Sequence, residues 1–361
     1  MLLYYIFLIP FINLSYISYS IGLLFSIFLI KLLLSKPLVA PIIDPNQPKN
    51  PVFLSILIPI YNEEQHIKNL IDILYSMSHN HEIIFINDLS TDNSLSILNK
   101  YQINYNYKIV NRMYKTGHVA GVLNAGLQHV SKKSNYIGVI NGDCHFNKDL
   151  ISNVVQLLEN TDISVLNLSN TTVCTKWCEY IAYLEKIFKN GLFKHAEASL
   201  NNGYFIRKSL LMELKGWSET TLTEDLELNL RIKKKGYTIY QSDLEIVDTV
   251  PETFKKLFNQ KYRWIKGDII NRYKYFPKDL YEIIVNIYYI FPLLTLVSFL
   301  ISWGIFLRNI FLIQLLIFMV EASLFYKFTN QFYNSLIYPI SQFMFSIYFY
   351  IYYMFDFNNK W

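Results

Sequence analysis

Three acidic side chains gather in one short segment, TLTEDLELNLRIKKKGY, which covers residues 221–237. Glu224, Asp225 and Glu227 would lie in the first turn of a helix whose last turns are basic, and Thr223 stands at the N-cap position. Acids at the start of a helix complement its dipole, so helix stability alone can explain the pattern. A carboxylate at the same place could also take a proton during catalysis.

The elements that would position such acids follow from apolar segments along the chain. Strands are predicted for FLSILIPI (53–60), EIIFIN (82–87), YKIVN (107–111) and YIGVIN (136–141), and helices for EEQHIKNLIDILYSM (63–77) and HVAGVLNAGLQHV (118–130). Strands that alternate with helices predict an α/β fold with a parallel sheet.

Polar residues follow three of these predicted strands. YNEE comes after the first strand, NDLSTDNS after the second and NGDCHFNKD after the fourth. Ligands of parallel sheets bind beyond the carboxyl ends of the strands, so these residues predict a binding site at one edge of the sheet. No Gly-x-Gly-x-x-Gly follows the first strand, which argues against a dinucleotide site.

In this order, the motifs resemble those of family 2 glycosyltransferases, in the membrane-embedded branch that includes cellulose, chitin and hyaluronan synthases and ceramide glucosyltransferase. The resemblance covers about residues 53–276. SILIPIYNEE resembles the opening strand and nucleotide pocket, INDLSTDNS the Asp-Asp-Gly-Ser-x-Asp element, NGDCHF the Asp-x-Asp site, TED the catalytic acid motif and QKYRW the Gln-x-x-Arg-Trp motif. The resemblance implies a nucleotide-sugar-binding, Rossmann-like domain of the GT-A type.

The resemblance also implies roles for individual residues. Asp143 would hold Mg²⁺ or Mn²⁺, because a divalent cation stabilises the charge that develops on a diphosphate leaving group. Asp225 would be the general base of an inverting transfer, with Glu224 beside it. The donor nucleotide would contact Pro59, Tyr61, Asn62, Glu63, Asp88, Asn141 and Asp143, and the diphosphate or acceptor would contact Gly203, Gln260, Arg263 and Trp264.

Each motif on its own also has a structural explanation. Asp88 and Asp143 could be turn residues, Gly203 could serve tight packing, and QKYRW could be the basic face and Trp anchor of an interfacial helix. Their order and spacing together favour the family.

Some positions depart from the family pattern. Asn87 and Leu89 replace Asp and Gly of the nucleotide motif, Asn141 replaces the first acid of Asp-x-Asp, and Val119 replaces a common lysine. These departures bear on donor affinity and metal dependence. The missing charges could be supplied by basic side chains nearby in the sequence, namely Lys115, His118 and His145. We do not assign His145 as a metal ligand.

The two ends of the chain are apolar, whereas its middle carries nearly all the Lys and Arg. Of the 361 residues 52% are hydrophobic and 17% charged, which is too apolar for an ordinary soluble enzyme. The uncharged run over residues 2–30 predicts one membrane helix near 11–34 rather than a cleaved signal peptide. Residues 283–303, 305–325 and 332–355 predict three more spans, and the positive-inside rule places the middle in the cytoplasm of a multi-pass cell-membrane protein.

These features divide the chain into five parts. They are an N-terminal transmembrane segment (1–36), a Pro-rich linker (37–52), a glycosyltransferase domain (53–250), an amphipathic interfacial segment with QKYRW (251–280) and three transmembrane helices (281–361). The net charge of +5 is modest, and basic residues near the membrane favour lipid headgroups or an anionic substrate over nucleic acid. Cys144, Cys174 and Cys178 lack the spacing of a zinc site and are expected to be free thiols.

The expected activity is an inverting, metal-dependent transfer of a hexosyl or N-acetylhexosaminyl group from a nucleotide sugar, a UDP sugar, to a growing glycan. One alternative is the transfer of a single sugar to a lipid, and another is a transporter or scaffold with a degenerate transferase domain. Glu321 lies in the third predicted span, where an ionisable group is functional by default. Its nearness to Lys327 equally allows a place at the membrane interface.

Overall fold

The computed structural model describes residues 37–38, 51–75, 81–195, 198–275 and 318–341. They belong to two compact units, one with residues 37–253 and 263–271 and the other with residues 254–262 and the C-terminal part. The predicted membrane segments 11–34 and 283–303 lie outside the described residues, and 305–325 and 332–355 lie only partly within them. In the described ranges, no helix has both the length and the apolar composition that a membrane crossing requires.

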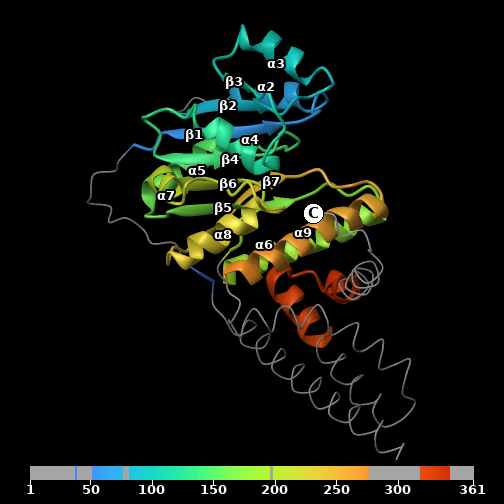
Figure 1. The fold of residues 1–361 in the computed structure, drawn as a ribbon. Coiled ribbons are helices and arrows are strands. Elements are labelled where there is room, and N and C mark those ends of the chain that lie inside the picture. The colour runs from blue at the N-terminus through green and yellow to red at the C-terminus, as the bar shows by residue number, and fades with distance from the viewer. Residues whose placement is uncertain (1–36, 39–50, 76–80, 196–197, 276–317, 342–361) are drawn as a thin grey trace, which may run out of the picture. The chain divides into compact units, whose positions relative to one another are not determined.

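A seven-stranded sheet in the order β3-β2-β1-β4-β6-β5-β7 forms the centre of the first unit (Figure 1). Its strands are β1 (Leu54–Ile60), β2 (His81–Asn87), β3 (Lys108–Asn111), β4 (Tyr136–Val139), β5 (Val165–Thr171), β6 (Tyr204–Arg207) and β7 (Ile239–Val247). The strands β1 to β4 pair in parallel, as predicted, and Ile60 is in register with Asn87. Their carboxyl ends therefore share one edge of the sheet.

The sheet as a whole is mixed rather than parallel, because β6 runs in the opposite direction to its neighbours. This strand is antiparallel to both β4 and β5, whereas β5 and β7 are parallel. Val139, at the end of β4, pairs with Tyr204, at the start of β6. The residues that precede β6 are therefore brought to the same edge as the residues that follow β4.

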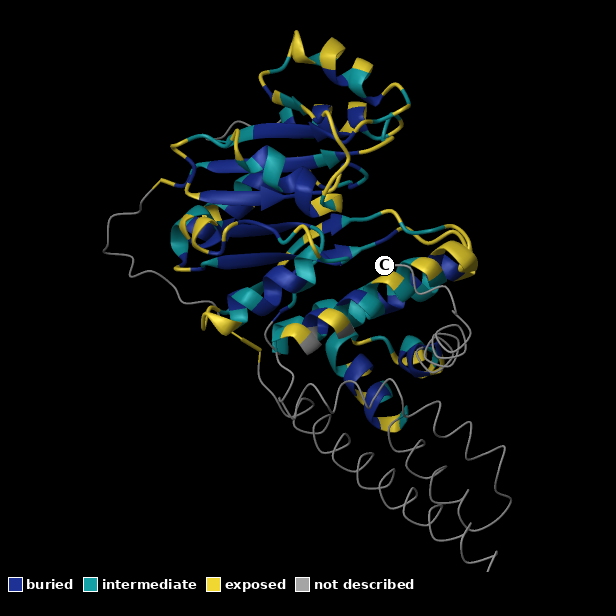
Figure 2. Ribbon diagram, viewed as in Figure 1, coloured by how far each residue is buried: buried dark blue, intermediate teal, exposed yellow. Residues whose placement is uncertain are grey.

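The labelled helices between residues 51 and 275 are α2 (Ile67–Tyr75), α3 (Ser94–Gln102), α4 (His118–Leu127), α5 (Leu150–Asn160), α6 (Trp177–His195), α7 (Lys208–Glu213), α8 (Glu224–Lys234) and α9 (Phe254–Tyr275). Apolar side chains of α2, α3 and α5 join one buried cluster, and those of α4, α7 and α8 join a second. In β1, Ile56 and Ile58 belong to the first cluster and Leu57 to the second, as alternating side chains of a strand must. The sheet is thus covered on both faces, and its strands are largely buried in Figure 2.

In the other unit, residues 318–329 and 332–341 are helical, and Asn330 between them has a φ of 56°. The rings of Phe325 and Tyr338 pack with their centroids 5.0 Å apart. Glu321 lies on the first of these helices and is 8% exposed. The burial of Glu321 is compatible with both a functional acid within a membrane span and an acid at the membrane interface.

Candidate active site

The loops after β1 and β2 hold each other at the carboxyl edge of the sheet. The Asn62 N–H donates to Ser90 Oγ at 3.1 Å, and Asn62 Oδ1 accepts from the Thr91 N–H at 2.8 Å. The Glu64 N–H donates to Asp92 Oδ2 at 3.1 Å. The two motifs predicted to surround the nucleotide are therefore adjacent in space, and Ser90 and Asp92 hold the loop after β1 against the loop after β2.

Tyr61 projects from the end of β1 with 47% of its surface exposed. The Nζ atom of Lys115 lies 3.6 Å from the centre of its ring. Val119, at the position where a lysine is common in the family, is 38% exposed and supplies no charge. Lys115 thus brings a cation to this part of the site from a different position in the chain, and the Tyr61 ring offers a face on which a base could stack.

Asp88 does not stand alone in the nucleotide motif, because it forms a buried ion pair that the sequence did not predict. Arg112 Nη1 donates to Asp88 Oδ1 at 2.5 Å, and the two side chains are 7% and 12% exposed. A second Arg112 nitrogen donates to the Thr116 carbonyl at 2.5 Å. Arg112 directly follows β3, and this position after a strand is the feature of the sequence that could have indicated a residue at the binding edge.

Two of the departures from the family pattern have structural consequences in this loop. The side-chain amide of Asn87 donates to Asn111 Oδ1 at 2.7 Å, so Asn87 bridges the ends of β2 and β3. Leu89 has a φ of 57°, in the left-handed region that favours glycine. The backbone thus has the conformation for which the family's glycine is suited, and a leucine adopts it at a cost.

Asp143 is placed beside β1 by close packing at Gly142. A Cβ atom on Gly142 would lie 2.6 Å from Ile60 Cδ1 and 3.2 Å from the Pro59 carbonyl, so the loop after β4 touches the end of β1. Burial, reinforced by the charges of Asp143 and Asp92, raises the pKa of Glu63 to about 7. Glu63 and Asp143 are therefore close enough to repel each other.

The residues around Asp143 suit a hard cation. Thr249 donates its hydroxyl to Asp143 Oδ2, and within the described ranges neither Asp143 nor Glu63 forms an ion pair. Mg²⁺ is held in nucleotide sites by one or two carboxylates together with phosphate oxygens and water. Asp143 fits that requirement, although the described residues contain no cluster of three or more His, Cys, Asp or Glu side chains that could bind a metal without substrate.

The segments that carry Asn141 and Gly203 meet where β4 ends and β6 begins. The Asn141 N–H donates to Asn202 Oδ1 at 3.0 Å. Gly203 has a φ of 77°, and a Cβ atom there would lie 2.5 Å from Ile246 Cδ1, so both conformation and space favour glycine. His145 Nδ1 lies 3.0 Å from Asn69 Nδ2 on α2, which gives its imidazole a structural partner.

The three acids of the opening segment have separate surroundings at the start of α8. Thr223 is the N-cap residue, as predicted. Among the described residues its side chain forms no capping hydrogen bond, and its hydroxyl instead accepts from Asn271 Nδ2 at 2.9 Å. Glu227 is buried and pairs with Arg231 at 2.7 Å, so it neither faces solvent nor reaches a substrate. Asp225 Oδ1 accepts from the Leu226 N–H at 2.8 Å.

Burial raises the pKa of the Asp225 carboxyl group. Burial also raises the pKa of Glu224, and the negative charge of Asp225 adds to this effect, so that the pKa of Glu224 reaches about 7. The positive charge of Arg263 lowers the pKa of both acids, and Lys189 lowers that of Asp225. These opposing effects leave two carboxyl groups next to cations, with proton affinities above their ordinary values.

Arg263 and Trp264 belong to the part of α9 that packs within the first unit. Arg263 Nη1 donates to the Leu222 carbonyl at 3.1 Å, directly before the acidic segment. Lys189 Nζ, on α6, lies 5.8 Å from the centre of the Trp264 ring. The structure therefore brings Glu224, Asp225, Arg263 and Trp264 together, while Gln260 lies earlier on α9, in the other unit.

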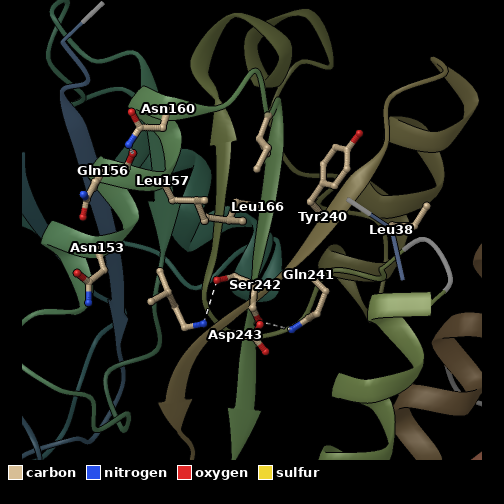
Figure 3. Close-up of a pocket in the computed structure, with 12 residues that line it drawn as sticks. Leu38, Asn153, Gln156, Leu157, Asn160, Leu166, Tyr240, Gln241, Ser242 and Asp243 are labelled. Atoms are coloured by element: carbon tan, nitrogen blue, oxygen red, sulfur yellow. Dashed lines mark hydrogen bonds between the residues drawn. The ribbon is translucent and has the colours of Figure 1, made fainter. Parts of the chain in front are cut away.

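A cavity of about 470 Å³ lies elsewhere in the first unit, between α5 and β7 (Figure 3). Asn153 and Gln156 of α5 line one side, and Tyr240 and Ser242 of β7 line the other. The cavity borders the amino-terminal half of β7, whereas the predicted site residues follow the carboxyl ends of strands. None of the predicted site residues lines it.

The three cysteines are free thiols, as predicted. Cys144 and Cys178 are buried, and Cys174 is exposed. Burial, together with the charges of Asp248 and Asp143, raises the pKa of Cys144, which keeps its thiol protonated beside the candidate metal ligand.

Comparison with known proteins places this site in a family. The model for glycosyl transferase family 2 matches residues 55–202, and the model for glycosyl transferase family group 2 matches residues 180–354. A probable glycosyltransferase of Bacillus subtilis, YdaM, is 26% identical over 294 residues, covering 73% of this chain and 66% of its own length. A probable glucomannan 4-beta-mannosyltransferase of Oryza sativa is 26% identical over 242 residues, covering 59% of this chain and 42% of its own. The chain thus spans less than two thirds of these relatives.

Among solved structures, a mannosyltransferase of Pyrobaculum calidifontis in complex with GDP-mannose and Mn²⁺ matches with a TM-score of 0.61. It is 15% identical, and the match covers 96% of this chain and 98% of the other. This likeness supports the predicted Rossmann-like α/β fold of the GT-A type. The two family models span both the donor motifs and the TED and QKYRW motifs, and the chain belongs to glycosyltransferase family 2.

Proposed function

We propose that the chain transfers a sugar, with inversion, from a nucleotide sugar to a growing glycan. The observation that carries the proposal is the position of Asp225, at the start of α8 beside Arg263, with a pKa that burial raises. A general base works best when its pKa lies near the working pH, so a raised carboxyl pKa suits proton removal from a sugar hydroxyl.

In the proposed reaction the acceptor hydroxyl loses its proton to the Asp225 carboxylate while its oxygen bonds to the anomeric carbon. The bond from that carbon to the diphosphate breaks, and the nucleoside diphosphate leaves with the electron pair. Arg263 can form charge-assisted hydrogen bonds to the departing diphosphate. Glu224 adjoins the base, and Trp264 offers a ring face to the acceptor sugar.

Mg²⁺ or Mn²⁺ would be held by Asp143 together with the donor phosphates. When bound, the cation supplies charge stabilisation to the diphosphate. Asp143 has a carboxylate without an ion-pair partner in the described ranges and a hydroxyl neighbour in Thr249, and these features support this role. Tyr61, Lys115 and the Asp88–Arg112 pair would bind the nucleoside part of the donor.

A UDP sugar is the donor that we propose first. GDP-mannose is the second candidate, because a relative is named a mannosyltransferase and the matched solved structure is a mannosyltransferase that contains GDP-mannose. Transfer of a single sugar to a lipid is the alternative to glycan extension. A transporter or scaffold function is disfavoured because Asp143, Asp225 and Arg263 are all present at their motif positions and because Arg263 lies close enough to Asp225 to lower its pKa.

We also propose that the chain is a multi-pass protein of the cell membrane with a cytoplasmic catalytic unit in contact with membrane lipids. The support is the uncharged run over residues 2–30 and the apolar runs after residue 281. A cysteine introduced at Asn46 should be shielded from an impermeant thiol reagent in intact cells, whereas one near the N-terminus should be labelled. Labelling at Asn46 would contradict this topology.

Activity is tested by incubating the full chain in lipid with radiolabelled UDP sugars and GDP-mannose. Transfer from one donor, with a product that lengthens as the reaction proceeds, is the expected result. A product that stays at one sugar per lipid with excess donor would replace glycan extension with the lipid alternative. No transfer from any nucleotide sugar, to either acceptor, would overturn the enzymatic proposal.

A further inference from the structure

The carboxylate of Asp248, directly after β7, joins three segments at the active edge of the sheet. Oδ2 accepts from Lys186 Nζ, on α6, at 2.7 Å. Oδ1 accepts from the thiol of Cys144, which follows β4, at 3.0 Å. The same oxygen also accepts from the side-chain amide of Asn202, which precedes β6. The Lys186 and Asp248 side chains are only 16% and 17% exposed, so the solvent screens their attraction less than it does on the surface.

The neighbours of this carboxylate hold the loop that carries Asp143. Thr249, the next residue in the chain, donates its hydroxyl to Asp143 Oδ2. Asn202 Oδ1 accepts the backbone N–H of Asn141 at 3.0 Å. One contact therefore restrains the Asp143 carboxylate itself, and the other restrains the backbone two residues earlier.

Metal-binding carboxylates are commonly oriented by outer partners, whose loss lowers metal affinity or activity by about 10–100-fold. We propose that Lys186 and Asp248 form a positioning pair for the metal site: Lys186 holds and neutralises Asp248, and Asp248 orders Asn202 and Thr249 around Asp143. This inference rests on the proposed metal-binding role of Asp143.

The same two segments provide a matched control. Lys194, two turns further along α6, pairs with Asp243 of β7, and the two side chains are 38% and 85% exposed. Exposed ion pairs of this kind contribute little to stability, and this one lies away from the Asp143 loop. Lys194→Gln and Asp243→Asn therefore change the same kinds of charge on the same elements, but without the contacts to Asn202 and Thr249.

The test is calorimetric titration of UDP and of GDP into the full chain over a series of Mn²⁺ concentrations, with thermal unfolding of the metal-free chain alongside. Asp248→Asn and Lys186→Gln should raise the Mn²⁺ concentration needed for half-maximal nucleotide binding by about 10–100-fold. The double variant should show less than the combined effect of the single variants, because the two groups act as a pair. Lys194→Gln and Asp243→Asn should leave the requirement unchanged.

Thr249→Val separates positioning from folding, because it removes only the hydroxyl on Asp143 and nearly preserves side-chain volume. It should raise the Mn²⁺ requirement without lowering the unfolding temperature. An unchanged requirement in both Thr249→Val and Asp248→Asn would overturn the positioning pair while leaving Asp143 as the metal ligand. If nucleotide affinity of the unmodified chain does not depend on the Mn²⁺ concentration, Asp143 has no metal-binding role, and this inference fails with it.

Discussion

Two pairs of carboxyl groups, Glu63 with Asp143 and Glu224 with Asp225, lie in contrasting surroundings. Within the described ranges the first pair has a hydroxyl neighbour and another acid, Asp92, but no ion-pair partner. The second pair lies next to Arg263, which lowers the pKa of both of its members. The contrast shows that the first pair has no cation from the described part of the protein and is suited to take one up from solution, whereas the protein supplies a cation, Arg263, to the second pair.

The contrast is broken most severely by removing the base. Asp225→Asn should lower turnover by about 10²–10⁴-fold, the range that general base catalysis contributes. Nucleotide binding should be nearly unchanged, because the base acts on the acceptor. A turnover assay beside calorimetry of UDP binding measures both, and retained turnover would remove Asp225 from the reaction.

Removing Asp143 from the other pair should instead impair nucleotide binding. We expect Asp143→Ala to abolish the Mn²⁺ dependence of nucleotide binding, with a loss of affinity of at least about 10–100-fold at saturating metal. Titrations of UDP with and without Mn²⁺ provide the measurement. An unchanged response to the metal would show that the ligand lies elsewhere.

The proton affinity of the second pair can be shifted without touching either acid. Arg263 lowers the pKa of Glu224 and Asp225, so Arg263→Gln should raise both values. Because the base must be deprotonated, the fall of kcat on the acid side should then begin at a higher pH. Arg263→Lys, which keeps the charge, is the control, and a pH–rate profile that does not move would contradict the assigned electrostatics.

The smallest expected effect concerns the backbone that supports the first pair. Leu89→Gly should remove the strain of a left-handed backbone conformation, which costs a leucine roughly 1–2 kcal/mol. The glycine also makes the unfolded chain more flexible, which offsets this gain by about 0.4–1 kcal/mol. The net result is a modest gain in the free energy of unfolding, measured by denaturant titration. Gly203→Ala, which would meet Ile246, should instead destabilise. A loss of stability in Leu89→Gly would show that the leucine side chain contributes more packing than strain.

Much of the fold could be predicted because apolar periodicity identifies strands and helices. The segments 53–60 and 82–87 correspond to β1 and β2 within a residue at each end. The direction of β6 could not be predicted, because a buried strand has the same composition whether it runs parallel or antiparallel to its neighbours. The mixed sheet depends on the connection through α6, which local sequence does not specify.

The candidate site was predictable where motifs are contiguous and not where partners come from distant segments. Thr223 has the sequence of a cap, but its hydroxyl is taken by Asn271, 48 residues away. Lys186 and Asp248 are 62 residues apart and belong to no motif that the resemblance supplies. Such pairs become visible only when the sheet brings strand ends together.

The contact of Thr223 with α9 has a mechanical consequence. A Cβ atom on Gly267 would lie 2.5 Å from Thr223 Oγ1, and Asn271 donates to both the hydroxyl and the carbonyl of Thr223. Sliding this part of α9 by one turn, about 5.4 Å, would break both hydrogen bonds and replace the glycine in that contact with a larger residue. These contacts restrain residues 263–271 against the start of α8. They therefore couple the position of Arg263 to that of Asp225, which lie on either side of the contact.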